Sequence, residues 1–406
     1  MPTWGELLRE LQEVQAQLNQ QLAQMPPGVP PPPLSSHDLV RRKYLRSLHE
    51  RTGRSVIVYA TAWMENRPGV PPDVLSIHLG DQQGLMEACS NLTDSRELDL
   101  FLHSPGGSAE AADAMMRYLR TQFDHIRAIV PLAAMSAATM MALACDEIVM
   151  GDHSQLGPID PQFTISTPEG PRGAPAQAIE DQFERAKLEC QNPENIAAWL
   201  PILRSYAPGL LAMCDHQRAL AQDFAAKALA SHMFRGDTDG EDKARRAAEW
   251  FSDFKEFRSH GRRVGHEEAS AQGLKVIRLE DDSEFQDAVL SVHHAIQHTF
   301  TATLSAKLVE NHLGRAWIRM AGEQSVQIVA APPPPGAPRH GVPSGPVLVP
   351  MPLPGALPQP PTGPPEVPPG GPPSPAAPGP PTQKPNEPLE DGGGAGPNGE
   401  AVTPSD

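Results

Sequence analysis

Runs that resemble strands and helices alternate between residues 55 and 150, and this alternation restricts the chain to few folds. The predicted strands are 55–62, 97–103, 126–130 and 147–150, and the predicted helices are 109–123 and 137–145. Strands that alternate with helices at this spacing form parallel sheets with right-handed crossovers. We therefore predict an α/β domain with a mostly parallel sheet.

The two ends of the chain differ from this part in composition. Residues 331–406 hold more than half of the 47 prolines, so they lack the apolar surface needed to offset chain entropy, and we predict a disordered Pro/Gly-rich tail. Residues 1–25 have the spacing of an amphipathic helix that packs on its own domain or self-associates, and a Pro-rich linker follows at 26–35. The folded domain is then 36–320. Its C-terminal part is predicted to be mostly helical, at 177–190, 196–231, 250–258 and 283–319.

Charge and cysteine content exclude several classes of protein. The net charge of −16 argues against nucleic acid, and four widely spaced cysteines argue against a metal centre. We expect no metal, no cofactor and a reduced, cytoplasmic setting without a signal peptide. The uncharged stretch 128–145 is interrupted by Pro131 and is better explained as a buried strand, turn and helix, so membrane contact is not indicated.

A glycine loop follows the second predicted strand. Ser104, Pro105, Gly106 and Gly107 connect this strand to a helix. Glycines let backbone N–H groups approach a bound oxygen atom, and the start of a helix favours negative charge. The loop is therefore either an oxyanion hole or a plain tight turn.

Ser136 lies at the next strand-to-helix turn. Small residues surround it, as they surround a serine nucleophile at such a turn, and the N–H of Ala137 is a candidate second oxyanion donor. Alternatively, Ser136 only caps the helix. Both loops follow parallel strands, at the sheet edge where ligands bind.

A nucleophilic serine requires a base, and two residues are candidates. Lys187 falls on the helix face that carries Ile179 and Phe183, where a lysine either extends its amine to solvent or is desolvated and acts as a base. His153 is the alternative base, or a loop histidine without a role. Residues 157–161 form a turn that is expected to line a substrate groove.

Four segments carry a family resemblance. FLHSPGGSAEAADAMMRYLR, PLAAMSAATMMALACDEIVM, SQLGPIDPQF and SHGRRVGHEEASAQGLKVIRL resemble the Clp/crotonase superfamily, and look closest to the serine dehydrogenase proteinases, relatives of signal peptide peptidase A. The resemblance covers roughly residues 40–320. It implies a Clp/crotonase-like spiral of ββα units.

The resemblance also implies an activity. It implies a serine peptidase with a Ser136/Lys187 dyad, an oxyanion hole at Gly106, Gly107 and Ala137, peptide or protein substrates, and a homo-oligomer. The histidine of the Clp protease triad is not matched, because it would fall near Pro158 or Ile159. A non-catalytic scaffold and a crotonase-like acyl-coenzyme A enzyme are the alternative functions.

Overall fold

A computed structural model describes residues 3–26, 34–65, 70–93, 95–167, 170–321, 325–329 and 347–350. Most of the predicted linker and tail lies outside these residues. Within the predicted tail, the described residues Val347–Pro350 form a strand. All described residues belong to one compact unit, Met1–Pro352.

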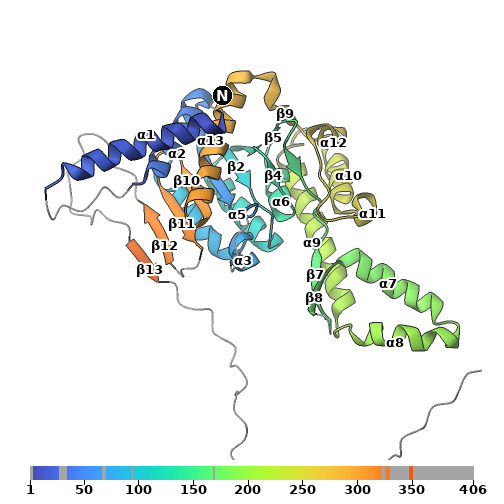
Figure 1. Cartoon of the computed structure of the whole chain (residues 1–406). Coiled ribbons are helices and arrows are strands. Elements are labelled where there is room, and N and C mark those ends of the chain that lie inside the picture. Colours follow the sequence, from blue (N-terminus) through green and yellow to red (C-terminus); the bar gives the residue numbers. More distant parts are fainter. Residues whose placement is uncertain are drawn as a thin grey trace, which may run out of the picture. The chain divides into compact units, whose positions relative to one another are not determined.

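In the described chain, nine strands form one sheet in the order β13-β12-β11-β10-β1-β2-β3-β5-β9 (Figure 1). Pairing is parallel from β1 to β9 and antiparallel from β1 to β13, so the predicted α/β class with a parallel central sheet is confirmed. The strands are β1 (Ser55–Thr61), β2 (Glu97–His103), β3 (His125–Val130), β5 (Glu147–Met150), β9 (Val276–Arg278), β10 (Ser305–Asn311), β11 (Ala316–Met320), β12 (Ser325–Val329) and β13 (Val347–Pro350). Two small sheets pair β4 (Ala133–Ala134) with β6 (Gln155–Leu156), and β7 (Gln162–Thr167) with β8 (Gly170–Pro175).

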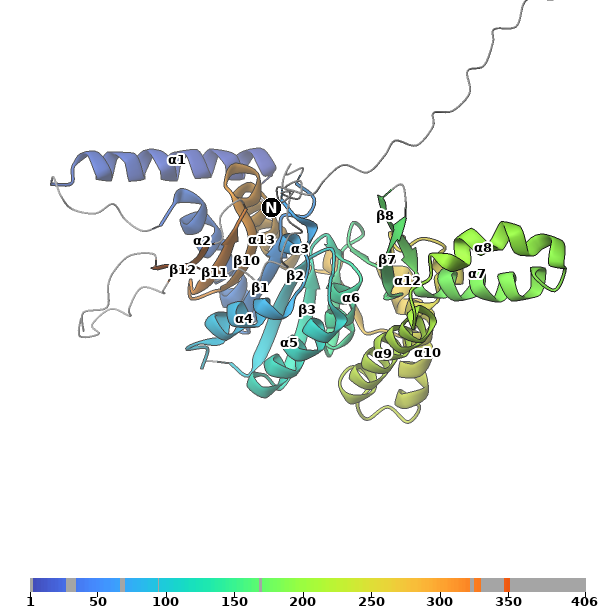
Figure 2. The same ribbon diagram turned by 90° about the horizontal axis from the view of Figure 1, so that it is seen from below.

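Helices cover both faces of the sheet, which explains why its strands are apolar on both sides. Figure 2 shows α2 and α13 on one face, and α4 and α5 on the other. The helices before β7 are α1 (Trp4–Ala23), α2 (Ser36–Thr52), α3 (Pro72–Leu75), α4 (Gln82–Cys89), α5 (Ala109–Gln122) and α6 (Ala137–Leu143). Those after β8 are α7 (Ala176–Glu189), α8 (Ile196–Arg204), α9 (Leu210–Ser231), α10 (Gly240–Ser252), α11 (Phe254–Phe257), α12 (His266–Ala271) and α13 (Ser283–Ala302).

Helix α1 packs on its own domain. Leu7 and Leu11 are buried against Val40 of α2 and Ala295 of α13. Of the two roles predicted for this helix, packing within the chain is the one observed. The uncharged stretch 128–145 forms β3, β4 and α6, as predicted.

The predicted helix over 283–319 is wrong in its second half. Helix α13 ends at Ala302, and β10 and β11 form a hairpin that extends the sheet beyond β1. Gly314, with φ of +87°, lies in the turn of this hairpin, where a left-handed conformation favours glycine. Pairing with β1 is a long-range contact, so it overrode the local helical appearance of the segment.

Candidate active site

The two predicted loops lie side by side at the end of the parallel strands. Ser104 forms a parallel bridge with Ala134 of β4. The N–H of Ser104 donates to Ala133 O at 3.1 Å, and the N–H of Met135 donates to Ser104 O at 3.0 Å. These bonds fix the glycine loop next to the turn that carries Ser136.

Ser136 has a strained backbone and a side chain that is not used as a cap. Its φ of 52° and ψ of −120° lie outside the regions that L-residues usually adopt. Its side chain makes no capping hydrogen bond to α6, so the alternative of a plain helix cap is wrong. Strain of this kind is typical of functional turns, including those that present a nucleophilic serine.

The glycine loop approaches this turn so closely that a side chain would not fit. Gly106 has φ of +96°, and a Cβ there would lie 2.7 Å from Ser136 Cβ. Gly107 has φ of +150°, and a Cβ there would lie 2.3 Å from Ile77 O. The Ile77 N–H donates to Gly106 O at 2.7 Å and holds the loop in place.

The backbone amides of the loop differ in their availability. The N–H of Gly106 donates to Ser104 Oγ at 3.2 Å. Within the described residues, the N–H groups of Gly107 and Ala137 have no acceptor. Of the three amides predicted for the oxyanion hole, these two are therefore the available donors.

A cavity of about 330 Å³ opens at the junction of the two loops. Its lining includes Gly106, Gly107, Ser136 and Ala137 together with Ile159, Asp160, Pro161 and His260. The turn at 157–161 thus borders this cavity, as predicted. Asp160 and His260 were not predicted as site residues, although both occur in the segments that carry the family resemblance.

Asp160 and His260 form a close pair in this cavity. His260 Nδ1 lies 2.7 Å from Asp160 Oδ1, and the Asp160 side chain is only 3% exposed. An ionised carboxylate only accepts hydrogen bonds, so in this contact Nδ1–H is the donor. Gln162 Nε2 donates to the other Asp160 oxygen at 2.6 Å.

Backbone contacts join the segments that carry Asp160 and His260 across a long stretch of sequence. Leu156 of β6 and Val264 exchange two backbone hydrogen bonds of 2.9 Å, which places the 259–265 loop beside the 155–160 segment. The N–H of Gly157 donates to Thr139 Oγ1 on α6 at 3.0 Å. The helix that begins after Ser136 is therefore tied to the segment that carries Asp160.

The structure does not bring the two predicted bases into this cavity. Lys187 is exposed on α7, and its Nζ pairs with Glu184 at 2.8 Å, so of the two alternatives for this lysine the amine that extends to solvent is the one observed. The buried face of α7 carries Ile179 and Ala186, and Lys187 lies one residue past that face. His153 is exposed in the turn between β5 and β6 and also lies outside the lining.

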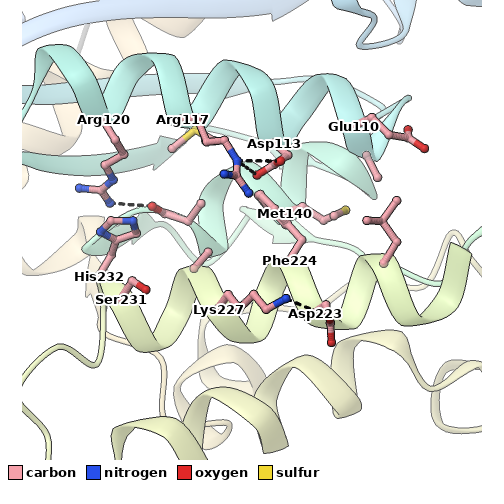
Figure 3. A pocket seen from close by; sticks show the side chains of 15 residues that line it. Glu110, Asp113, Arg117, Arg120, Met140, Asp223, Phe224, Lys227, Ser231 and His232 are labelled. Atoms are coloured by element: carbon pink, nitrogen blue, oxygen red, sulfur yellow. Dashed lines mark hydrogen bonds and ion pairs between the residues drawn. The ribbon is translucent and has the colours of Figure 1, made fainter. Parts of the chain in front are cut away.

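A second, larger cavity of about 480 Å³ lies between α5 and α9 (Figure 3). Met140 of α6 and Phe224 of α9 lie between the two helices, and charged side chains lie along them. Its lining shares Ala109, Glu110 and Met140 with the cavity of Ser136. The two cavities therefore adjoin.

Across the described ranges, no group of three or more His, Cys, Asp or Glu residues is arranged to hold a metal ion. No helix in the described part of the chain combines the length and apolar character needed to cross a bilayer.

Comparison with known proteins identifies a family that part of the chain resembles. Residues 33–183 match the family described as ClpP-like SDH-type serine proteinases. The resemblance to the serine dehydrogenase proteinases is therefore confirmed over this segment. The match includes Ser136 and Asp160 and ends before Lys187 and His260.

Two relatives come from Methanocaldococcus jannaschii. The uncharacterized protein MJ0137 is 33% identical over 125 residues, which cover 31% of this chain and 44% of that protein. The uncharacterized protein MJ1495 is 34% identical over 87 residues, which cover 21% of this chain and 30% of that protein. The chain thus spans less than half of the length of either relative.

A solved structure also shows some likeness. A mutant of the 1510-N membrane-bound stomatin-specific protease aligns with a TM-score of 0.32 and 15% identity, covering 52% of this chain and 79% of that chain.

Proposed function

We propose that this protein is a serine peptidase that hydrolyses peptide bonds with Ser136 as nucleophile, His260 as general base and Asp160 as the residue that orients it. One observation carries the proposal. A strained serine that does not cap its helix shares a cavity with buried Asp160, with the half-buried His260 that pairs with it, and with two unused backbone N–H groups.

Each residue has a defined task in this reaction. His260 Nε2 accepts the hydroxyl proton as Ser136 Oγ attacks the peptide carbonyl, and later passes that proton to the leaving amine. Asp160 accepts the Nδ1–H bond and holds the ring in the required tautomer. In the second half of the reaction, His260 Nε2 takes a proton from a water molecule as the water oxygen attacks the acyl carbonyl. The ester bond to Ser136 Oγ then breaks, and His260 returns the proton to that oxygen.

The charge that develops on the carbonyl oxygen requires donors that are already in place. The N–H groups of Gly107 and Ala137 are such donors, and Gly106 contributes the space that lets the loops meet. Removing one donor from an oxyanion hole typically lowers turnover by about 10²–10³-fold.

The Ser/Lys dyad is the alternative form of the same activity. It requires Lys187 to reach Ser136 from another copy of the chain, because Lys187 lies outside the cavity of its own chain. The two alternative functions, a scaffold and an acyl-coenzyme A enzyme, give the Asp160–His260 pair no role. The pair therefore favours the peptidase.

A fluorophosphonate probe together with a peptidase assay tests the proposal. We expect labelling of the wild type and none of Ser136→Ala. His260→Ala should lower turnover by at least about 10³-fold. Asp160→Asn should lower kcat with KM unchanged and add no loss to His260→Ala, because Asp160 acts through the ring.

His266→Ala is a matched control, because His266 also pairs with an aspartate, Asp152 at 3.0 Å, outside the cavity lining. It should keep normal turnover, as should His153→Ala and Lys187→Ala. An inactive Lys187→Ala beside an active His260→Ala would instead establish the dyad. Absence of labelling in the wild type would refute the peptidase.

A further inference from the structure

We infer that the cavity between α5 and α9 is a substrate subsite that binds apolar side chains of a peptide extending from the cleavage site. This inference rests on the proposed peptidase function and adds the class of substrate. It is carried by the continuity of the two cavities and by the chemistry of the lining (Figure 3).

The two cavities follow one another along α9. Gln217 and Ala221 line the cavity of Ser136, and Leu220 and Phe224, on adjacent turns of the same helix, line the larger cavity. On the opposite wall, Glu110 borders both and accepts a hydrogen bond from Gln217 Nε2 at 3.3 Å. A peptide whose carbonyl lies at Ser136 thus meets the larger cavity next.

The charged side chains around this cavity are already paired. Arg117 binds Asp113 at 2.8 Å, and Lys227 binds Asp223 at 3.0 Å, as the dashed lines in Figure 3 mark. Arg120 binds Asp146 at 2.7 Å. Each of these cations already has a carboxylate partner, so a phosphate or carboxylate ligand would have to compete with that partner.

The remaining surface of the cavity is apolar and adaptable. Met116, Met140 and Ala144 are buried beneath it, and Phe224 lies beside them. His232 is uncharged at neutral pH, because burial lowers its pKa to about 4. Methionine side chains adjust to different apolar shapes. A volume of about 480 Å³ accommodates more than one side chain.

The test compares long and short substrates. The long substrates are quenched fluorescent ten-residue polyalanine peptides in which each position carries Leu, Phe or Ser in turn. The short substrate is p-nitrophenyl acetate, which does not extend into the larger cavity. In the wild type, we expect Leu or Phe at one or two positions outside the scissile pair to raise kcat/KM about tenfold over Ser.

Two variants change the cavity in different ways. Ala228→Trp fills it, and Leu220→Asp places a charge at its exposed rim, where the fold tolerates it because Leu220 is 41% exposed. Both should remove the preference for Leu and Phe and leave ester hydrolysis within twofold. The matched controls on α9 are Ala219→Trp and Met213→Asp, which are exposed and line neither cavity.

Three results would overturn the inference. They are a wild type without a preference for Leu or Phe, cavity variants that keep the preference, and cavity variants that slow the ester as much as the peptides. In each case, labelling of Ser136 by fluorophosphonate shows that the peptidase proposal still stands. A wild type that is neither labelled nor active on the ester refutes the proposed function itself.

Discussion

An alanine in place of Gly106 would put a methyl group between the two loops that meet at Ser136. Its Cβ would lie 2.5 Å from Met135 O, 2.7 Å from Ser136 Cβ and 2.9 Å from Ala137 N. Real Cβ atoms essentially never show contacts under 3.0 Å, so the turn that carries Ser136 must move by several tenths of an ångström. The three atoms belong to Met135, to Ser136, which is the proposed nucleophile, and to Ala137, which is a proposed oxyanion donor.

Two effects lower the folding stability of the Gly106→Ala variant. The positive φ of +96° costs alanine about 1–3 kcal/mol of folding stability, and the overpacking costs about 1–3 kcal/mol more. Gly236→Ala is the matched control, because Gly236 has φ of +85° and nothing within 4 Å of its added Cβ. The difference between the two variants in unfolding free energy therefore isolates the contact with the Ser136 turn.

Urea unfolding gives that difference, and a peptidase assay gives its consequence for the reaction. We expect Gly106→Ala to lower turnover by about 10²–10³-fold, as the displacement of one oxyanion donor does. Gly236→Ala should leave turnover unchanged. Normal turnover in a folded Gly106→Ala variant would refute the reasoning, because the glycine loop would then lie away from the reacting oxygen.

Two further predictions concern buried ionisable groups. Burial lowers the pKa of His103 to about 4, so between pH 4 and 6.5 the unfolded chain binds more protons than the folded chain. The unfolding free energy should therefore fall by about 3 kcal/mol as the pH drops through this window. Chemical denaturation at several pH values should show a smaller fall for His103→Phe. Lys307→Met should lower the unfolding free energy measured in urea by about 3–5 kcal/mol, because it leaves buried Asp81 without the cation that lies 2.6 Å away and removes the donor to Ser76 O. A loss below about 1 kcal/mol would contradict this account.

Local sequence patterns predicted the centre of the fold and the two loops of the candidate site. Strands β1, β2, β3 and β5 and helices α5 and α6 follow from apolar runs, helical spacing and turn residues, all of which are read within a few residues. Gly106, Gly107 and Ser136 could be found in the same way, because each follows a strand and precedes a helix. Their meeting follows from the parallel sheet, whose strands end at one edge.

Features set by distant contacts escaped prediction. The hairpin of β10 and β11 forms because β1 offers an edge for pairing across more than 200 residues of sequence. The exposure of Lys187 depends on which side of α7 packs, and the buried side carries Ile179 and Ala186. Each residue of a helix is rotated by about 100° from the one before it. Helical spacing therefore places Lys187 near the buried side, and it does not show whether the side chain is covered or exposed.

The proposed base, His260, illustrates the same limit at the level of chemistry. Asp160 and His260 are a hundred residues apart, and neither forms a motif with Ser136 by spacing alone. They meet because Leu156 pairs with Val264, a backbone contact that has no signature in side-chain type. The sequence that follows Ser136 therefore favours Lys187 as the base, although its side chain is exposed to solvent. The buried carboxylate of Asp160 instead holds His260. The two candidate bases are distinguished by turnover, which His260→Ala should lower and Lys187→Ala should leave unchanged.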